Sequence, residues 1–319
     1  MKKLIVSLLC LAMLFSLAAC GSAPAKEKDS FTVGICQLAP HVALDAATQG
    51  FKDALTEALG DKVTFVEHNA AGDSATCSTI CNQLAAENVD LIMANATPAL
   101  LAAAAATSTI PILGTSVTHY GTALGIDDWK GYTGTNISGT SDLSPMDEQA
   151  NMIADLFPDA KNVGVLFCSA EPNSVFQADT IEPLLTAKGF TVTRFTFADS
   201  NDVATVTANA CAASDILYIP TDNTAATCAE TINNVCQPAG VPVFCGEAGL
   251  CSGCGAFTLS IDYYDLGIAT GKMALQILTE GADVSTMEIG FAPDPQKQYN
   301  APLCAALGLD IPADYVAIG

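Results

Sequence analysis

The sequence has few basic residues and few histidines. It contains 12 Lys and Arg against 34 Asp and Glu, which gives a formal net charge of −22 at pH 7. Such an acidic surface repels phosphate, so nucleic acid and anionic lipid headgroups are poor partners for this chain. Of the three histidines, His41 and His119 follow predicted strands, but no His-x-x-x-His or His-Glu-x-x-His spacing is present. No metal site is therefore expected.

The sequence also lacks the common catalytic motifs. It has no Gly-x-Ser-x-Gly, no P-loop and no dinucleotide-binding fingerprint. One C-x-x-C pair, Cys251 with Cys254, lies in a glycine-rich stretch and not in a thioredoxin-like unit, so a local disulfide or free thiols are expected there instead of redox exchange. We predict that the chain is not an enzyme and needs no cofactor.

The N-terminus has the pattern of a processing signal. Lys2 and Lys3 precede an apolar run at residues 4–17, which is too short to span a membrane well. The run ends in Leu17-Ala18-Ala19-Cys20-Gly21, which resembles the bacterial lipobox. That resemblance implies a signal peptide at residues 1–19, diacylglycerol on Cys20, a tether at residues 20–30, and anchoring to the outer face of the bacterial cytoplasmic membrane. A plain secretory peptide is the alternative.

The cysteine content is high for an exported protein. The chain has 13 cysteines, and an odd number remains once Cys10 and Cys20 are set aside, so at least one is unpaired or pairs elsewhere. Cys36, Cys168 and Cys245 lie in apolar runs and are expected to be small buried hydrophobic residues.

From Phe31 onward, short apolar runs alternate with helical patterns. Strands are predicted at residues 31–38, 63–67, 91–94, 110–114, 162–168, 191–197, 215–219, 241–245 and 256–260, and helices at 45–59, 74–88, 97–107, 144–157, 175–188, 203–211 and 224–236. This alternation predicts parallel sheets with right-handed crossovers. The pattern begins again after Asn136, so we predict an α/β protein with two similar doubly wound domains.

The last segment is too small to form a third domain. It reads as a helix at residues 263–278, a strand at 287–291 and an irregular tail from Pro295. If the helix returns to the first domain, the chain crosses between domains near Ser141, Ile261 and Phe291, and several crossings form a hinge. This predicts an N-terminal lobe of residues 31–141 and 262–290 and a C-terminal lobe of residues 142–261 and 291–319. Their facing sheet edges would form a cleft.

One stretch in the first domain predicts an anion-binding helix start. Residues 91–94 have the pattern of a strand buried on both faces, and Thr97-Pro98 reads as an N-cap followed by a first helical proline. Free backbone N–H groups at such a start attract carboxylates. An ordinary β–α turn is the alternative interpretation.

Several motifs together resemble a known family. They are His41-Val42-Ala43-Leu44-Asp45, Ala96-Thr97-Pro98-Ala99, Gly139-Thr140-Ser141-Asp142, Glu171-Pro172-Asn173-Ser174, Pro220-Thr221-Asp222-Asn223 and Asp262-Tyr263-Tyr264-Asp265-Leu266-Gly267. With the lipobox, they are similar to the ABC-transporter substrate-binding lipoproteins of the type I periplasmic-binding-protein fold, which include binders of tryptophan and other aromatic amino acids. The cysteine-bearing loop from Cys245 to Cys254 departs from that pattern.

The resemblance implies a zwitterionic ligand, which needs donors for its carboxylate and acceptors for its ammonium. The predicted ligand-binding residues are Gln37, His41, Thr97, Pro98, Ala99, Ser116, Thr118, Asp142, Glu171, Asn173, Ser174, Asp222, Asn223, Glu247 and Asp262. Asn173, Ser174, Asp222 and Asn223 would serve equally as helix caps or turn residues. Tyr120, Tyr218 and Tyr263 would line an aromatic pocket or belong to the core.

We therefore expect a lipid-anchored receptor that captures an amino acid, preferably an aromatic one, closes around it, and delivers it to an ABC permease driven by a separate ATPase subunit. The alternatives are a receptor for a nucleoside or another small amphiphile, and a sensor module for a signalling partner.

Overall fold

Six parallel strands form the sheet of the first domain. A computed structural model describes residues 30–318, so the predicted signal peptide, Cys20 and nearly all of the tether lie outside the described residues. The strands are β1 (Phe31–Gln37), β2 (Val63–Asn69), β3 (Leu91–Asn95), β4 (Ile112–Val117), β5 (Ile137–Ser141) and β11 (Gly290–Phe291). Their order is β11-β5-β4-β3-β1-β2. Every residue of β3 is buried, as its continuous apolar run predicts.

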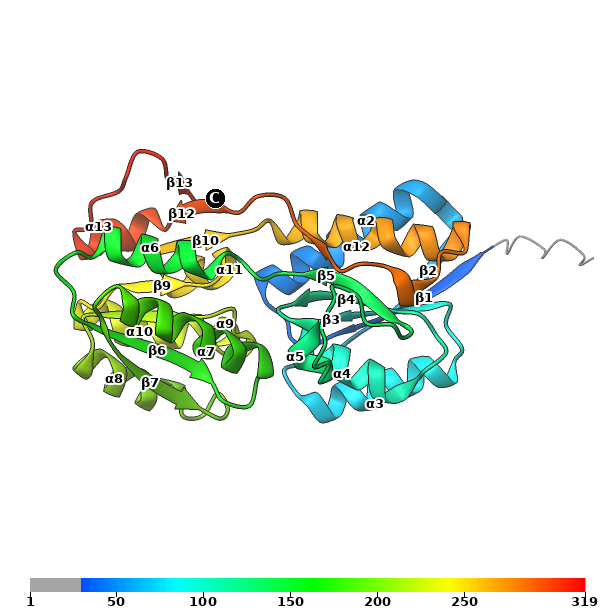
Figure 1. The fold of residues 1–319 in the computed structure, drawn as a ribbon, viewed down its shortest axis with the longest axis horizontal. Helices are drawn as coiled ribbons and strands as arrows, with labels where there is room; N and C mark the ends of the chain where they lie inside the picture. Colours follow the sequence, from blue (N-terminus) through cyan, green and yellow to red (C-terminus); the bar gives the residue numbers. More distant parts are fainter. Residues whose placement is uncertain (1–29, 319) are drawn as a thin grey trace, which may run out of the picture. The chain divides into compact units, whose positions relative to one another are not determined.

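Helices cover both faces of this first sheet (Figure 1). On one face lie α2 (Val42–Leu59) and α12 (Tyr263–Glu280), whose apolar side chains pack with β1 and β3. On the other face lie α3 (Ser74–Ala86), α4 (Thr97–Ala106) and the short α5 (Tyr120–Leu124). A 3-10 turn, η1 (Gly60–Lys62), leads into β2, and η2 (Val284–Thr286) precedes β11.

The second domain repeats this architecture. Its strands are β6 (Asn162–Cys168), β7 (Thr191–Phe197), β8 (Ile216–Ile219), β9 (Val243–Cys245), β10 (Phe257–Ser260), β12 (Gln296–Tyr299) and β13 (Val316–Ala317), in the order β13-β12-β10-β9-β8-β6-β7. The β10–β12 pair is antiparallel, and the other pairs are parallel. One core cluster includes α6 (Met146–Leu156), α7 (Pro172–Ala187) and α13 (Ala301–Leu307), and another includes α8 (Val203–Ala213), α9 (Asn223–Thr227), α10 (Ala229–Ala239) and α11 (Ala248–Cys254).

The chain passes between the two sheets three times. It leaves the first sheet after β5, returns after β10 through α12, and leaves again after β11 to form β12. Two α/β domains with parallel sheets and several crossings are thus confirmed. The exact lobe boundaries given above stay a prediction, although Phe291, assigned there to the second lobe, pairs with Ser141 in the first sheet.

Close packing of α2 against α12 fixes the second crossing. A Cβ atom at Gly50 would lie 2.1 Å from the backbone oxygen of Tyr264, and one at Gly267 would lie 2.1 Å from that of Ala47. Only glycine permits this approach of two backbones. The start of α12 is therefore held beside the first turns of α2.

The structure corrects several predicted elements. The predicted helix 224–236 is two helices, α9 and α10, because the chain departs from helical geometry at Cys228. The tail is not irregular, since β12 pairs with β10 and α13 packs on the second core. Helices α5 and α11 and strand β5 were not predicted, because short elements carry little periodicity.

Candidate functional site

The edge of the first sheet presents polar side chains from three neighbouring strands. Thr97 follows β3, Ser116 and Thr118 lie at the end of β4, and Asp142 follows β5. Neighbouring strands lie about 4.8 Å apart, so these residues form one row along the sheet edge. All four are buried.

Two residues of this edge have strained backbones. Ala96 has φ 85° and Ser116 has φ 54°, in the left-handed region that non-glycine residues rarely adopt. Ala96, not Thr97, is the N-cap of α4, so the prediction that Thr97 caps this helix is wrong. Because it is not used as a cap, the Thr97 hydroxyl is buried without a hydrogen-bond partner. Strain of this kind concentrates at functional sites.

The strain at Ala96 can be measured. We expect Ala96→Gly to raise the free energy of unfolding by about 1 kcal/mol, because glycine adopts this φ without a steric penalty. Urea unfolding monitored by circular dichroism tests this. An equally sized loss of stability would show that the backbone at Ala96 is relaxed.

Asp142 is the most isolated carboxylate of the site. Its side chain is 3% exposed and accepts hydrogen bonds from the Thr118 hydroxyl (3.1 Å) and from the Tyr263 hydroxyl (3.0 Å). Burial raises the pKa of Asp142 to about 6, although both hydroxyls oppose the shift. No described ion pair involves it. A positively charged partner would stabilise its ionised form.

In the second domain, the predicted acids act largely as helix caps. The Glu171 carboxylate accepts from the backbone N–H of Asn223 (3.1 Å) and of Thr224 (2.8 Å), and from both of their side chains. Asp222 caps α9 through Ala225 and also accepts from the backbone N–H of Cys168. Burial raises the pKa of Asp222 to about 7. These two acids hold the cleft-side loops of the second domain in place.

Asn173 and Ser174 open α7 next to this network. The Asn173 amide nitrogen donates to Glu171, to the Ser174 hydroxyl and to the carbonyl of Thr221 (3.0 Å). Its amide oxygen, however, is buried and has no partner. Asn173 therefore still offers an acceptor to the cleft.

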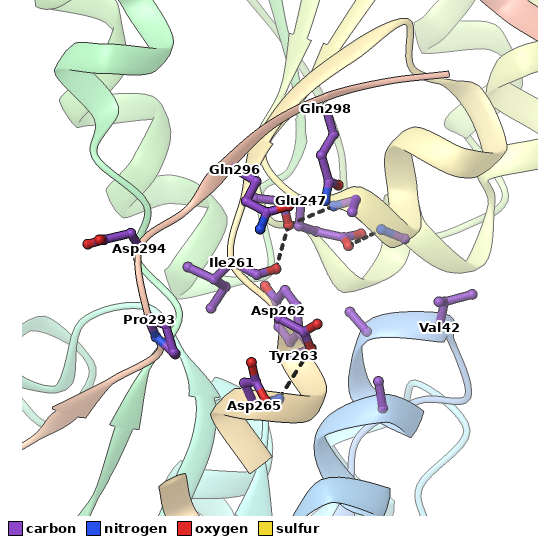
Figure 2. Close-up of a pocket in the computed structure, with 15 residues that line it drawn as sticks. Val42, Glu247, Ile261, Asp262, Tyr263, Asp265, Pro293, Asp294, Gln296 and Gln298 are labelled. Atoms are coloured by element: carbon purple, nitrogen blue, oxygen red, sulfur yellow. Dashed lines mark hydrogen bonds between the residues drawn. The ribbon is translucent and has the colours of Figure 1, made fainter. Parts of the chain in front are cut away.

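Glu247 and Asp262 cap α11 and α12 beside a cavity of about 260 Å³. Figure 2 shows this hinge-side cavity between the start of α2 at Val42, the start of α12 at Tyr263 and the strand carrying Gln298. Its acidic lining residues are Glu247, Asp262, Asp265 and Asp294, and its lining includes no Lys or Arg. Burial raises the pKa of Glu247 to about 7.

Several contacts join the domains across the cleft. The His41 Nε2 atom lies 3.2 Å from the Asn223 side-chain oxygen, and the Gln177 amide nitrogen lies 3.3 Å from the Thr118 hydroxyl. The His119 ring stacks on Phe176 with 4.7 Å between ring centroids. A second cavity of about 460 Å³ lies between Leu38 and Pro98 of the first domain and Glu171 of the second. The domains therefore meet in a closed arrangement.

Unpartnered polar atoms gather where the domains meet. The Thr97 hydroxyl, the Ser116 hydroxyl, the Asn173 oxygen and the His41 Nδ1 atom are all buried without hydrogen-bond partners. Thr97 and Asn173, from different domains, line one small cavity of about 10 Å³. Buried polar groups are nearly always paired, so these four atoms can form hydrogen bonds with a small molecule held between the domains.

Some predicted residues have other positions. The Gln37 amide is used within the first domain, donating to Asp45 (2.6 Å) and accepting from Thr48 (2.6 Å). Tyr120 and Tyr218 belong to the core, whereas Tyr263 reaches the cleft. Pro98 and Ala99 are buried in the first turn of α4. Sequence reasoning missed Gln177 and Phe176, because polar and aromatic residues inside a helix carry no recognisable signal.

The cysteines of the described residues are all free. Cys36, Cys168 and Cys245 are buried, as their apolar context predicts. Cys251 and Cys254 lie buried in α11 as free thiols, which is one of the two alternatives left open above. Within residues 30–318, no group of three or more His, Cys, Asp or Glu side chains is placed to hold a metal ion, and no helix is long and apolar enough to cross a membrane.

A comparison with known families matches residues 32–314 to the model described as "ABC transporter substrate binding protein". The chain belongs to this ABC substrate-binding family. A tyrosine-binding protein from Clostridioides difficile is 31% identical over 266 residues, covering 82% of this chain and 76% of that protein.

Solved structures agree with this family assignment. A domain from Streptococcus pneumoniae in complex with L-Trp is 30% identical, with a TM-score of 0.85 over 89% of this chain and 96% of that one. A ligand-free, open substrate-binding protein with adhesive properties from Clostridium difficile is 33% identical, with a TM-score of 0.68 over 91% of this chain and 100% of that one. The fold of this substrate-binding protein is that of the type I periplasmic binding proteins.

The raised carboxyl pKa values predict how the stability of this substrate-binding protein depends on pH. Asp142, Asp222 and Glu247 have folded pKa values of about 6, 7 and 7, above their ordinary values. The folded state therefore binds protons before the unfolded state, and the free energy of unfolding should rise as the pH falls from about 8 to about 6.5. Urea unfolding at several pH values measures this.

Below about pH 6.5, His41 and His119, whose pKa values burial lowers, oppose the trend. Stability that falls from pH 8 to 6.5 would contradict the prediction.

Proposed function

We propose that this substrate-binding protein captures a free amino acid with an aromatic side chain between its two domains and presents it to an ABC importer. The observation that carries the proposal is the set of unpartnered polar atoms at the closed interface, on Thr97, Ser116 and Asn173. A zwitterion supplies both the donor and the acceptors that these atoms lack.

We assign the ligand ammonium to the carboxylate end of the polar row. Asp142 is buried and accepts hydrogen bonds only from hydroxyls. Glu247 lies near it, and the Asp142 charge adds to the effect of burial in raising the pKa of Glu247. No Lys or Arg side chain is described in contact with Asp142 or Glu247. A ligand ammonium is therefore the partner that these two carboxylates favour. The same electrostatics disfavour ligands with a net negative charge.

The ligand carboxylate then lies two strands away, at the start of α4. The first backbone N–H groups of a helix have no partner within the helix, and Thr97 adds a free hydroxyl beside Ala99. Ser116 supplies a second free hydroxyl on the adjacent strand. Two strand spacings, about 10 Å, separate Asp142 from the start of α4, and Ser116 lies between them, so an amino acid can contact both ends across β4.

The remaining predicted residues shape and close the site. His41, Asn173, Asn223 and Thr118 form or border the contacts between domains, while Glu171, Ser174, Asp222, Asp262 and Gln37 hold their loops through caps and buried hydrogen bonds. The higher TM-score with the L-Trp complex than with the open, ligand-free protein supports a closed conformation around a ligand of this kind.

In this proposal the protein performs no chemistry on its ligand. Lipid attached to Cys20 holds it outside the cytoplasmic membrane, and an ABC permease with its ATPase subunit receives the amino acid. The lipobox-like sequence Leu17-Ala18-Ala19-Cys20 supports the anchor, and the family supports the permease partnership.

A thermal-shift panel of amino acids and nucleosides tests the ligand class. L-Tyr, L-Trp and L-Phe should raise the melting temperature, by mass action, more than L-Glu or any nucleoside at equal concentration. A nucleoside shift without an amino-acid shift would favour the alternative receptor, and no shift with any amino acid would refute the proposal.

A further inference from the structure

Two cysteines of the second domain lie with their sulfur atoms in contact. Cys211 is on α8 and Cys236 is on α10, and their Sγ atoms are 3.6 Å apart. A disulfide requires an S–S distance of about 2.05 Å, so the two sulfurs need to approach by roughly 1.6 Å. Since α8 and α10 pack on the same core cluster, a small adjustment of these side chains brings them together.

The two thiols differ in exposure and in pKa, as the attacking and resolving thiols of a dithiol pair do. Cys211 is half-buried and reachable from solvent, whereas Cys236 is 2% exposed. The hydrogen bond between the two thiols lowers the pKa of Cys211 and raises the pKa of Cys236. The accessible thiol is therefore the attacking one, and the buried thiol is the resolving one.

We propose that Cys211 and Cys236 form a reversible disulfide that links α8 to α10, with a small or protein disulfide as the oxidant. The Cys211 thiolate attacks the oxidant and expels one thiol, leaving a mixed disulfide. Cys236 then loses its proton, attacks the Cys211 sulfur and expels the second thiol. Two protein thiols are oxidised to one disulfide, and one oxidant disulfide is reduced to two thiols.

The linkage would enclose the part of the second domain that faces the cleft. The segment between the two cysteines contains β8 and α9, and with them Asp222 and Asn223. Closing this loop restricts the unfolded chain and stabilises the loop that contacts His41. Oxidation would thus stiffen one wall of the cleft without touching the polar row of the first domain.

Peptide mass mapping of the native protein, before and after incubation with hydroxyethyl disulfide, tests the proposal. We expect a Cys211–Cys236 cross-link and a melting temperature higher by about 5 °C, both reversed by reductant. Cys236→Ser should instead retain a mixed disulfide on Cys211, and Cys211→Ser should show neither product. Cys228→Ser, at another half-buried cysteine, is the matched control and should behave like the parent.

A mixed disulfide that persists on Cys211 in the parent would overturn the proposal, as would a cross-link to a different cysteine or no reaction. The readout does not involve the ligand, so it is independent of the proposed amino-acid binding.

Discussion

Replacing Asp142 by Asn should weaken the binding of an aromatic amino acid by about 100-fold, because the buried ion pair with the ligand ammonium is lost. The amide keeps the shape of the side chain and can still contact Thr118 and Tyr263. Isothermal titration calorimetry with L-Trp and L-Tyr, at a pH of about 8 where the parent carboxyl is ionised, measures the change.

The same variant should fold at least as stably as the parent. Burial already disfavours the charged form of Asp142, as its raised pKa indicates, so a neutral amide removes a desolvation cost at pH 8. Asp147→Asn, at an exposed position on α6, is the matched control and should leave affinity and stability unchanged. Unchanged affinity in Asp142→Asn would remove this carboxylate from the ligand site.

Replacing Glu171 by Ala should lower the free energy of unfolding by about 3 kcal/mol. The Glu171 carboxylate accepts hydrogen bonds from the backbone and side chains of Asn223 and Thr224 and from the Asn173 amide. Its removal leaves several part-buried donors unpaired at the start of α9. Urea unfolding, followed by circular dichroism, measures the loss.

Two further variants separate this network effect from loss of charge. Glu171→Gln retains one acceptor oxygen and should fall between the parent and Glu171→Ala. Glu182→Ala removes an exposed carboxylate that pairs with Arg194, and should cost no more than about 1 kcal/mol. If Glu171→Ala were as mild as Glu182→Ala, the network would not stabilise the second domain as argued.

The sequence is sufficient to predict most of the fold, because buried parallel strands have continuous apolar sequences. The predicted strands at residues 162–168 and 191–197 coincide with β6 and β7. The three predicted crossings lie where the chain passes from one sheet to the other. The strand and helix of the tail were missed because β12 and α13 are stabilised by packing on a distant part of the chain.

The roles of the acidic residues could not be separated from sequence. Glu171, Asp222, Glu247 and Asp262 follow strands just as Asp142 does, yet these four make helix-start hydrogen bonds while Asp142 has only hydroxyl partners. Local sequence allows both uses, and the direction of each side chain depends on neighbours that are far apart in the chain. Gln177, which bridges to Thr118, is unrecognisable for the same reason.

The most direct test of the central claim is calorimetric titration of protein that has been unfolded, washed free of bound small molecules and refolded. We expect one site per chain that binds L-Trp or L-Tyr with a Kd of about 1 μM or below, and that binds L-Glu far more weakly. Saturation with these aromatic amino acids that produces no heat and no binding, in protein shown to be refolded, would contradict it.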